Sequence, residues 1–433
     1  MKTGKIGWFI FFWLLGVNTA FAQQLDYAKK VVETLASPAF KGRGYVAKSD
    51  QLAAAFIAKE FKTAGLLPIN KGSYYQDFSL PVNTFPGKVE VKLNGQLLQT
   101  AVDYLVDASS PAVKGDFKVI PVMRSDINSL EKLKSLAQLA RDSFILLDNR
   151  PAENEGKAEK EIIAEHIAAL RNSVELEFKG LLLFSEDKLT WTSLPFQNIR
   201  PVIIINKKGL DPATIKSVSL DIEVKFDPAY HTRNVAAMVK GKSLSDSTLV
   251  LTAHYDHLGM LGSKVYFPGA NDNASGVAML LSLAKYYAKH PPKYNMVFLA
   301  FSGEEIGLLG SKAFIQQPLI DLSKIRFLVN FDLAGTGDEG IKVVNGTIFK
   351  RQFDLLQQLN QEYQLLPKVD IRGEACNSDH CLFYAKGVPS FFIYTQGGIQ
   401  AYHDIYDKAE TLPFTKFEPY FRLMVKFFDS GRL

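Results

Sequence analysis

The spacing of apolar residues divides the chain into a helical start, a middle region of short apolar runs, and a third region in which strands and helices alternate. Residues 25–36 and 49–66 repeat apolar side chains at intervals of three and four, which predicts two amphipathic helices, with Ser49 or Asp50 as the N-cap of the second. The connector between them reads SPAFKGRGY, and its glycines permit tight backbone geometry.

The middle region, from about residue 85 to residue 226, consists of short apolar segments separated by Gly, Pro, Asn and Asp turns. Segments of this length and spacing predict a β-rich module. One helical stretch, residues 159–175, lies among them and contains His166, to which we assign a structural role. The expected strands are residues 89–95, 117–123, 143–149, 180–186, 201–207 and 219–226.

From residue 227 onward, near-continuous apolar strands alternate with helices, which is typical of a sheet that is covered by helices on both faces. We therefore expect an α/β fold with a mixed, mainly parallel sheet, built from residues 23–84 and 227–433, with a β-rich domain inserted at residues 85–226. The expected strands and helices are 233–239, 247–254, 295–302, 325–333 and 388–395, and 274–290, 304–317, 349–363 and a last helix from about Phe417.

The first 22 residues have the features of a secretory signal peptide. Lys2 and Lys5 precede an apolar run from Ile6 to Val17, and Ala20-Phe21-Ala22 has the small-x-small form of a cleavage site. The alternative, an uncleaved membrane anchor, would need roughly 20 apolar residues. We expect the signal peptide to be removed, leaving an exported protein, periplasmic or secreted, with no membrane span.

Composition adds little to this picture. The chain has 433 residues, 47% hydrophobic and 22% charged, which is ordinary for a globular protein. The formal charge of +5 falls to +3 without Lys2 and Lys5, and the basic residues are scattered. A net charge this small, with its basic residues scattered along the sequence, does not indicate a nucleic-acid-binding surface.

The only cysteines, Cys376 and Cys381, lie close together in the sequence GEACNSDHCLF. In an exported protein this spacing favours a disulfide that orders one short loop, worth about 2 kcal/mol on the chain-entropy model. A role in metal binding would need other ligands.

Histidines and carboxylates come directly after several of the predicted strands. In sheets of this kind, ligands bind beyond the carboxyl ends of the strands, which is where these side chains would lie. Nitrogen from imidazole and oxygen from carboxylate suit zinc or a similar divalent ion. The adjacent pair Glu304 and Glu305 has a simpler alternative, because acidic residues in the first turn of a helix gain about 0.3–1 kcal/mol from its dipole. The candidate residues are His254, Asp272, Glu304, Glu305, Asp332 and His403.

These segments resemble a known family. The strings HYDHLG, GANDNASGVA, FSGEEIGLLGS, NFDLAG, SDHCLFYAKGVPS and YHDIYDKAET occur in this order in the chain. They resemble the dinuclear-zinc aminopeptidases, which include bacterial leucyl aminopeptidase and aminopeptidase Y, with glutamate carboxypeptidase as a more distant relative. The resemblance spans about residues 25–80 and 230–430 and implies a zinc exopeptidase fold. Residues 85–226 weakly resemble the protease-associated domain that is often inserted in this family.

The resemblance implies a site for two Zn²⁺ ions, although other divalent ions would suit it. Asp272 would bridge the ions, His254 and Asp332 would complete one site, and Glu305 and His403 would complete the other. Three other histidines, His231, His257 and His290, are assigned structural roles.

Three further residues receive catalytic roles from the same resemblance. Glu304 would be the general base. Asp256 would orient the imidazole of His254, the alternative being a capping or solvated aspartate. Tyr402 could donate a hydrogen bond to the tetrahedral intermediate, or could simply be a packed tyrosine. Residues 378–380 resemble a motif that lines the site without binding metal.

The implied function is an exported metallopeptidase that removes N-terminal residues from peptides with a free N-terminus. The alternatives are a glutaminyl cyclase with one zinc, a carboxypeptidase-type specificity on the same fold, and a binding protein with a degenerate site. The inserted domain could cover the mouth of the site and restrict substrate length, or it could be a passive insertion.

Overall fold

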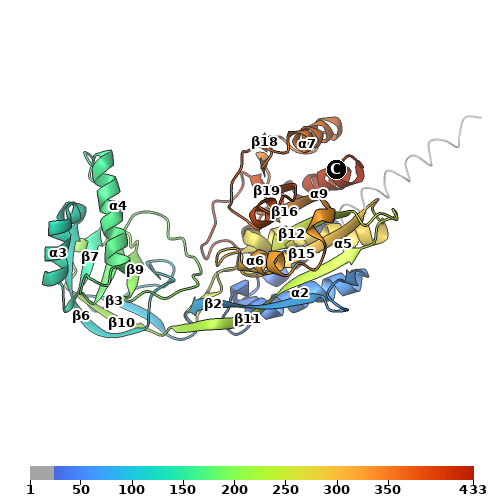
Figure 1. Ribbon diagram of the computed structural model, residues 1–433. Helices are drawn as coiled ribbons and strands as arrows, with labels where there is room; N and C mark the ends of the chain where they lie inside the picture. Colours follow the sequence, from blue (N-terminus) through green and yellow to red (C-terminus); the bar gives the residue numbers. More distant parts are fainter. Residues whose placement is uncertain (1–23) are drawn as a thin grey trace, which may run out of the picture.

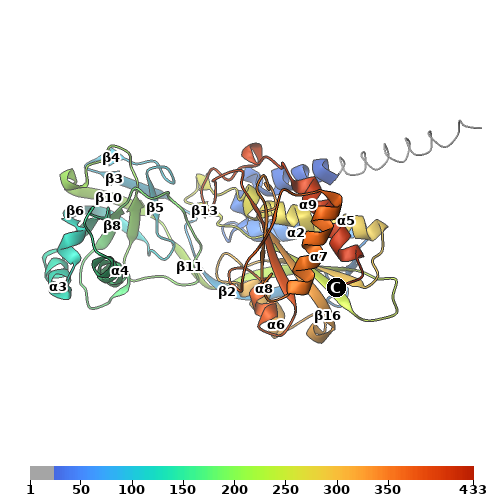
Figure 2. The same cartoon turned by 90° about the horizontal axis from the view of Figure 1, so that it is seen from above.

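The computed structural model describes residues 24–433 and contains two large sheets joined by a long two-stranded ribbon (Figures 1 and 2). The predicted signal peptide, residues 1–22, lies outside the described range. A helix covers residues 24–35, as expected, and the SPAFKGRGY connector forms a short helical turn, Pro38–Arg43.

The larger sheet has nine strands in the order β1-β11-β15-β12-β16-β19-β17-β18, with β2 paired to β11. Its centre, β15-β12-β16-β19, is parallel, whereas β11 runs antiparallel to β15 and β17 runs antiparallel to β19; β18 pairs with β17 in parallel. The strands are β1 (Leu67–Pro68), β2 (Tyr75–Thr84), β11 (Lys225–Val239), β12 (Thr248–His254), β15 (Asn295–Phe301), β16 (Ile325–Asp332), β17 (Gly340–Val344), β18 (Val369–Ile371) and β19 (Ser390–Gln396).

Helices cover both faces of this sheet, which confirms the expected fold. Along β12, Leu249 and Leu251 join the core beneath α2, α5, α7 and α9, while Val250 between them joins the core beneath α6 and α8. Side chains of a strand alternate between faces, so a strand buried on both sides reads as a continuous apolar run. The helices are α2 (Ser49–Ala64), α5 (Gly276–Lys289), α6 (Leu309–Gln316), α7 (Lys350–Tyr363), α8 (His380–Tyr384) and α9 (Phe417–Asp429).

The second sheet lies within residues 89–222 and has eight strands in the order β4-β3-β10-β6-β7-β8-β9-β5. Strands β6 to β9 are parallel, and the region is β-rich as the sequence analysis expected. The strands are β3 (Val89–Leu93), β4 (Gln96–Leu97), β5 (Tyr104–Val106), β6 (Val113–Met123), β7 (Ser143–Asp148), β8 (Gly180–Phe184), β9 (Val202–Ile205) and β10 (Ser217–Ile222).

Two helices accompany the second sheet, and one of them was missed. The expected helix is present as α4 (Lys157–Asn172), but α3 (Leu130–Leu139) was not predicted. Its signals are in the sequence, because Ser129 accepts a hydrogen bond from the Lys132 N–H as an N-cap and the buried Leu133 and Leu136 are three residues apart.

The ribbon of β2 and β11 connects the two sheets. Lys225 pairs with Thr84 at one end of the ribbon and Val235 with Tyr75 at the other, with a bulge between Asp227 and Tyr230. Beyond this pairing β11 continues as a strand of the larger sheet, against β15. A smaller hairpin, β13 (Met260–Leu261) with β14 (Val265–Tyr266), lies on the segment after β12.

The helix expected to begin at Glu304 begins at Leu309 instead. Glu304 and Glu305 lie in the loop that follows β15, where Gly307 and Leu308 have left-handed φ angles of 98° and 61°. A residue in that region interrupts a helix. The helix-dipole explanation for the glutamate pair is therefore wrong.

The second helix begins at Ser49, but neither expected residue caps it. The Ser49 hydroxyl donates to the Gly44 carbonyl oxygen, and the buried Asp50 carboxylate accepts hydrogen bonds from the Tyr230 and Thr232 hydroxyls at 2.6 and 2.7 Å. Burial raises the Asp50 pKa to about 6, although these hydrogen bonds oppose the shift. Asp50 therefore links α2 to β11 through two hydrogen bonds, and ionisation of its buried carboxyl is unfavourable.

This buried carboxyl should make stability depend on pH. A folded-state pKa above the unfolded value stabilises the fold at low pH, and that contribution is lost as pH rises through about 6. Asp50→Asn should keep both contacts without a charge, so the free energy of unfolding of the variant relative to wild type should rise by about 2 kcal/mol between about pH 4.5 and about pH 7.5. Urea unfolding at both pH values measures the difference, and a difference that does not change with pH contradicts the prediction.

The expected disulfide is present. Cys376 and Cys381 are bonded, with their Cα atoms 4.9 Å apart, and they enclose the loop that leads into α8. Across residues 24–433, none of the helices has the length and apolar character needed to cross a membrane.

Candidate metal centre

The candidate residues meet at the carboxyl edge of the parallel strands. β12 is hydrogen-bonded to β15 on one side and to β16 on the other, so the three strands end at the same edge. His254 is the last residue of β12, Asp332 is the last of β16, and Glu304 follows β15 after a short turn. Asp272 lies in the helical turn Ala270–Ser275 ahead of α5, and His403 lies in the loop after β19.

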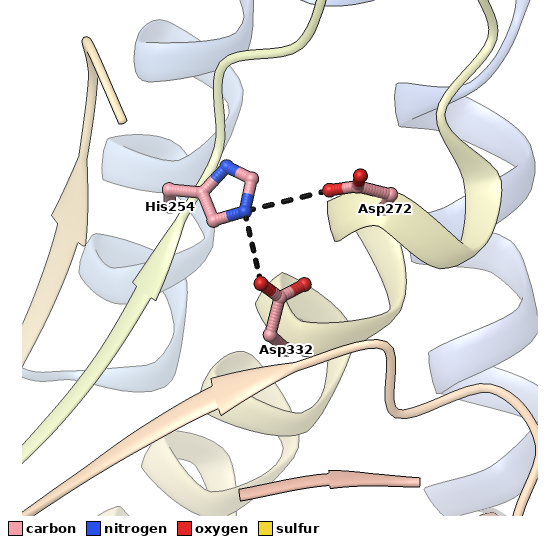
Figure 3. Close-up of side chains that lie close together, drawn as sticks. All are labelled: His254, Asp272 and Asp332. Carbon is pink, nitrogen blue, oxygen red and sulfur yellow. Dashed lines mark ion pairs between the residues drawn. The ribbon is translucent and has the colours of Figure 1, made fainter. Parts of the chain in front are cut away.

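The first group of ligand atoms comprises His254, Asp272 and Asp332 (Figure 3). The Nε2 atom of His254 lies 3.5 Å from Asp272 Oδ1 and 3.4 Å from Asp332 Oδ2. One ligand atom from each residue lies within the 4.8 Å spacing that a single ion can bridge. The three residues predicted to hold one ion are therefore together.

The second group uses the other oxygen of Asp272. The Nε2 atom of His403 lies 3.1 Å from Asp272 Oδ2 and 3.2 Å from Glu305 Oε2. Asp272 thus presents one oxygen to each group, as a bridging carboxylate would.

His257 also belongs to this site, contrary to the structural role assigned from sequence. Its Nδ1 lies 2.6 Å from Glu305 Oε1, its buried Nε2 has no hydrogen-bond partner, and His257, Asp272 and Glu305 have ligand atoms within 4.8 Å of one another. The signal was its position three residues after His254 in HYDHLG. Because His403 lies close to both Asp272 and Glu305, we take His403 as the ligand and His257 as the group that orients Glu305.

The charges of the site fit a divalent cation. Burial opposes protonation of His254, but Glu304 and Asp332 outweigh it and raise its pKa well above the ordinary value. His403 behaves in the same way, its pKa being raised to about 11 by Glu305 and Asp272 against the effect of burial. The carboxylates therefore stabilise a positive charge near both Nε2 atoms. A zinc ion bound by nitrogen and oxygen ligands would provide that charge.

The adjacent glutamates have opposite electrostatic environments. Burial raises the Glu304 pKa well above its usual range, and the charges of Asp379 and Glu305 add to the shift. Burial acts in the same direction on Glu305, but His403 and His257 outweigh it and hold its pKa well below the usual range. Two carboxyls driven apart in this way are suited to different tasks, one as a ligand and one as an acid and base.

Asp256 is in the site, but its carboxylate does not orient His254 as expected. The His254 Nδ1 atom lies 3.2 Å from the backbone carbonyl oxygen of Asp256 and 3.8 Å from the carboxylate, which is beyond hydrogen-bonding distance. The carboxylate instead accepts the backbone N–H groups of Glu304 and Glu305 at 3.2 and 3.3 Å and the Tyr45 hydroxyl at 2.8 Å. It therefore fixes the turn that carries both glutamates.

Arg43 is a structural support of the site that sequence reasoning missed. Its side chain is fully buried, and burial lowers its pKa to about 10, although Asp407 and Asp272 oppose the shift. The guanidinium donates to the backbone carbonyl oxygens of Leu35, Tyr255, Pro268, Gly269 and Asp272. The only sequence signal was the FKGRGY string, which the resemblance covered without giving the arginine a role.

Asp407 supports the same turn from the other side. Its carboxylate accepts the backbone N–H groups of Asn271 and Asp272 at 2.8 and 3.0 Å. It lies in the YHDIYDKAET string, four residues after His403, so the segment that carries one candidate ligand also positions the backbone of another, Asp272.

The other residues singled out from sequence take more peripheral places. Tyr402 is 46% exposed, and its ring stacks on His403 with centroids 4.0 Å apart, so it is not a core tyrosine. His380 is outside both ligand groups; its Nε2 contacts the Ala375 carbonyl oxygen, and burial lowers its pKa to about 4. His166, His231 and His290 contact Ile127, Ser79 and Tyr286, away from the two groups.

The mouth of the site lies where the ligands remain partly exposed. The His254, Asp272 and Glu305 side chains are 1%, 4% and 3% exposed, whereas those of Asp332, Glu304 and His403 are 12%, 14% and 17% exposed. Asp332, Glu304 and His403 therefore form the outer edge of the site.

Comparison with known proteins identifies the part of the chain that carries this site. Residues 234–428 match the sequence model described as Peptidase family M28. A probable zinc metalloprotease from Pyrenophora tritici-repentis is 39% identical over 113 residues, which are 25% of this chain and 23% of that protein. Aminopeptidase YwaD from Bacillus subtilis is 31% identical over 143 residues, covering 32% of this chain and 30% of that protein. These alignments span less than a third of the length of either relative.

The fold extends further than the sequence similarity. The structure of a zinc aminopeptidase from Bacillus subtilis superimposes with a TM-score of 0.68 at 17% identity, covering 94% of this chain and 94% of that one. The likeness therefore includes both sheets.

Proposed function

Because residues 234–428 match the model of peptidase family M28, we propose that this chain is an exported, two-zinc aminopeptidase that removes N-terminal residues from peptides. The observation that carries the proposal is the pair of ligand groups that share Asp272, one with His254 and Asp332 and the other with Glu305 and His403. Such a site fits two ions held by histidine and carboxylate.

When bound, two zinc ions would polarise the scissile carbonyl, lower the pKa of water and offset the developing negative charge. The chain itself supplies the proton transfers. We assign to Glu304 the removal of a proton from the attacking water and its delivery to the nitrogen of the leaving amine. Its raised pKa, caused by burial and neighbouring carboxylates, supports both steps, and its partial exposure places it at the mouth.

The proposal includes export, on the pattern of residues 1–22 and on the disulfide, which persists in oxidising compartments. Glutaminyl cyclisation and carboxypeptidase-type cleavage are the competing activities. The two complete ligand groups favour hydrolysis with two ions over a one-zinc cyclase.

The testing experiment measures metal content and substrate preference on one sample. Protein collected from outside the cytoplasm is expected to begin at Gln23, to hold two zinc ions per chain, and to hydrolyse aminoacyl-arylamides but not the same compounds blocked at the amino group. Activity on blocked substrates with a free carboxyl terminus would instead favour a carboxypeptidase. Cyclisation of N-terminal glutamine with a single zinc would favour a cyclase, and absence of bound zinc would contradict the proposal.

A further inference from the structure

The segment that connects β8 and β9 of the second sheet reaches the proposed metal ligand His403. The His403 Nδ1 atom donates to the backbone carbonyl oxygen of Trp191 at 2.9 Å. In return, the backbone N–H of Trp191 donates to the backbone carbonyl oxygen of His403 at 2.9 Å. This reciprocal pair turns Nε2 of His403 towards Asp272 and Glu305.

A hydrogen bond of this kind decides which nitrogen can bind metal. When Nδ1 carries the proton and donates it, the lone pair of a neutral imidazole lies on Nε2, and the ring is held in one orientation. His254 obtains its acceptor two residues away, from the Asp256 carbonyl oxygen. The acceptor for His403 is the Trp191 carbonyl oxygen, 212 positions away in the sequence and outside the region that matches family M28.

Lys188 binds the same loop three residues before Trp191. Its Nζ atom lies 2.7 Å from the Gln400 carbonyl oxygen, 3.2 Å from that of Tyr402 and 2.6 Å from the Asp404 carboxylate. The Asp404 carboxylate is nearly buried and also accepts the Tyr406 N–H at 2.8 Å. Lys188 therefore holds two backbone carbonyls before His403 and the side chain of the residue after it.

The Trp191 side chain anchors this segment to both parts of the molecule. The indole is 6% exposed, and its N–H donates to the Val106 carbonyl oxygen of β5 at 2.7 Å. Its ring stacks on Phe267, with centroids 4.8 Å apart and planes 20° apart, and Phe267 lies shortly before the turn that carries Asp272. The position of the Trp191 carbonyl is thereby fixed relative to the ligands.

From these contacts we propose that Lys188 and Trp191 are positioning residues for His403, so that the second-sheet region builds one of the two zinc sites instead of only covering the mouth. This inference rests on the proposed function, because it takes His403 as a zinc ligand. It also gives the inserted region a role that neither length restriction nor a passive insertion explains.

The test measures zinc affinity by competition with a chromophoric chelator on the full mature chain. Trp191→Ala and Lys188→Ala should each weaken one of two zinc-binding steps by about 10-fold or more, because partners of ligating histidines contribute on this scale, and should leave the other step unchanged. Trp191→Phe and Lys188→Arg should restore most of the affinity. Lys207→Ala is the matched control, since Lys207 pairs with Asp103 in the second-sheet region.

A second readout follows from the tryptophan itself. Trp191 is the only tryptophan after residue 13, so its fluorescence in the mature chain should change as zinc enters the His403 site, and His403→Ala should abolish the change. Two wild-type-like zinc affinities in both alanine variants would overturn this inference alone. A wild-type chain that binds no zinc would overturn the proposed function and this inference together.

Discussion

Glu304→Gln is expected to bind zinc as tightly as the wild type does but to turn over aminoacyl-arylamides more slowly by about 10²–10⁴-fold. The amide has nearly the same shape as the carboxylate, and the backbone N–H of residue 304 still donates to Asp256. The amide cannot accept the proton of the attacking water, so the variant should have a lower kcat. Steady-state kinetics and zinc content of the purified variant measure both quantities.

The neighbouring residue provides the matched control. Glu305→Gln removes a carboxylate that contacts His403 and His257, so this variant should lose zinc as well as activity. The two variants separate proton transfer from metal binding at adjacent positions of one loop. Glu304→Gln activity within about tenfold of wild type would contradict the assignment of the base, since general-base catalysis contributes at least about 100-fold.

Arg43→Met is expected to lower the free energy of unfolding by about 3–5 kcal/mol, because several buried carbonyl oxygens lose a charged donor and each such loss costs about 1–3 kcal/mol. The variant removes the guanidinium donors from several buried carbonyl oxygens, including those of Gly269 and of the proposed bridging ligand Asp272 itself. Zinc affinity should fall as well, because the turn that carries Asp272 loses a support. Urea unfolding followed by circular dichroism and chelator competition measure the two effects.

Arg200 offers a control with the same chemistry away from the site. It is 5% exposed and donates to the carbonyl oxygens of Leu170, Ser173 and Leu176 in the second-sheet region. Arg200→Met should therefore lower stability without weakening zinc binding. If Arg43→Met does not fold, Arg43→Lys, which keeps the charge but has fewer donors, serves instead; equal zinc affinities in Arg43→Lys and wild type would contradict the prediction.

Sequence patterns predicted the central sheet well because its strands are buried on both faces. Strands such as β12 and β15 appear as continuous apolar runs, and polar residues at their ends stand out. The patterns did less well in the second-sheet region, where α3 has a short and partly exposed apolar stripe. They also placed the start of α6 too early, because Gly307 and Leu308 adopt left-handed φ angles that only the packed loop determines.

By itself, the sequence determined which side chains can bind metal and the order in which the strands present them. His254, Asp272, Glu305, Asp332 and His403 were identified by residue type and position, and the structure brings all of them together. Their ligand chemistry belongs to the side chains, so it is visible before folding.

Only the tertiary structure decided how these side chains are held. The groups that orient them are largely backbone atoms, such as the carbonyl oxygens of Asp256 and Trp191, or residues brought from far along the chain, such as Arg43. A backbone carbonyl is the same in every residue, so its place beside a ligand leaves no signature in the sequence. The assignment of Trp191 to His403 depends on how the segment between β8 and β9 packs against the loop after β19.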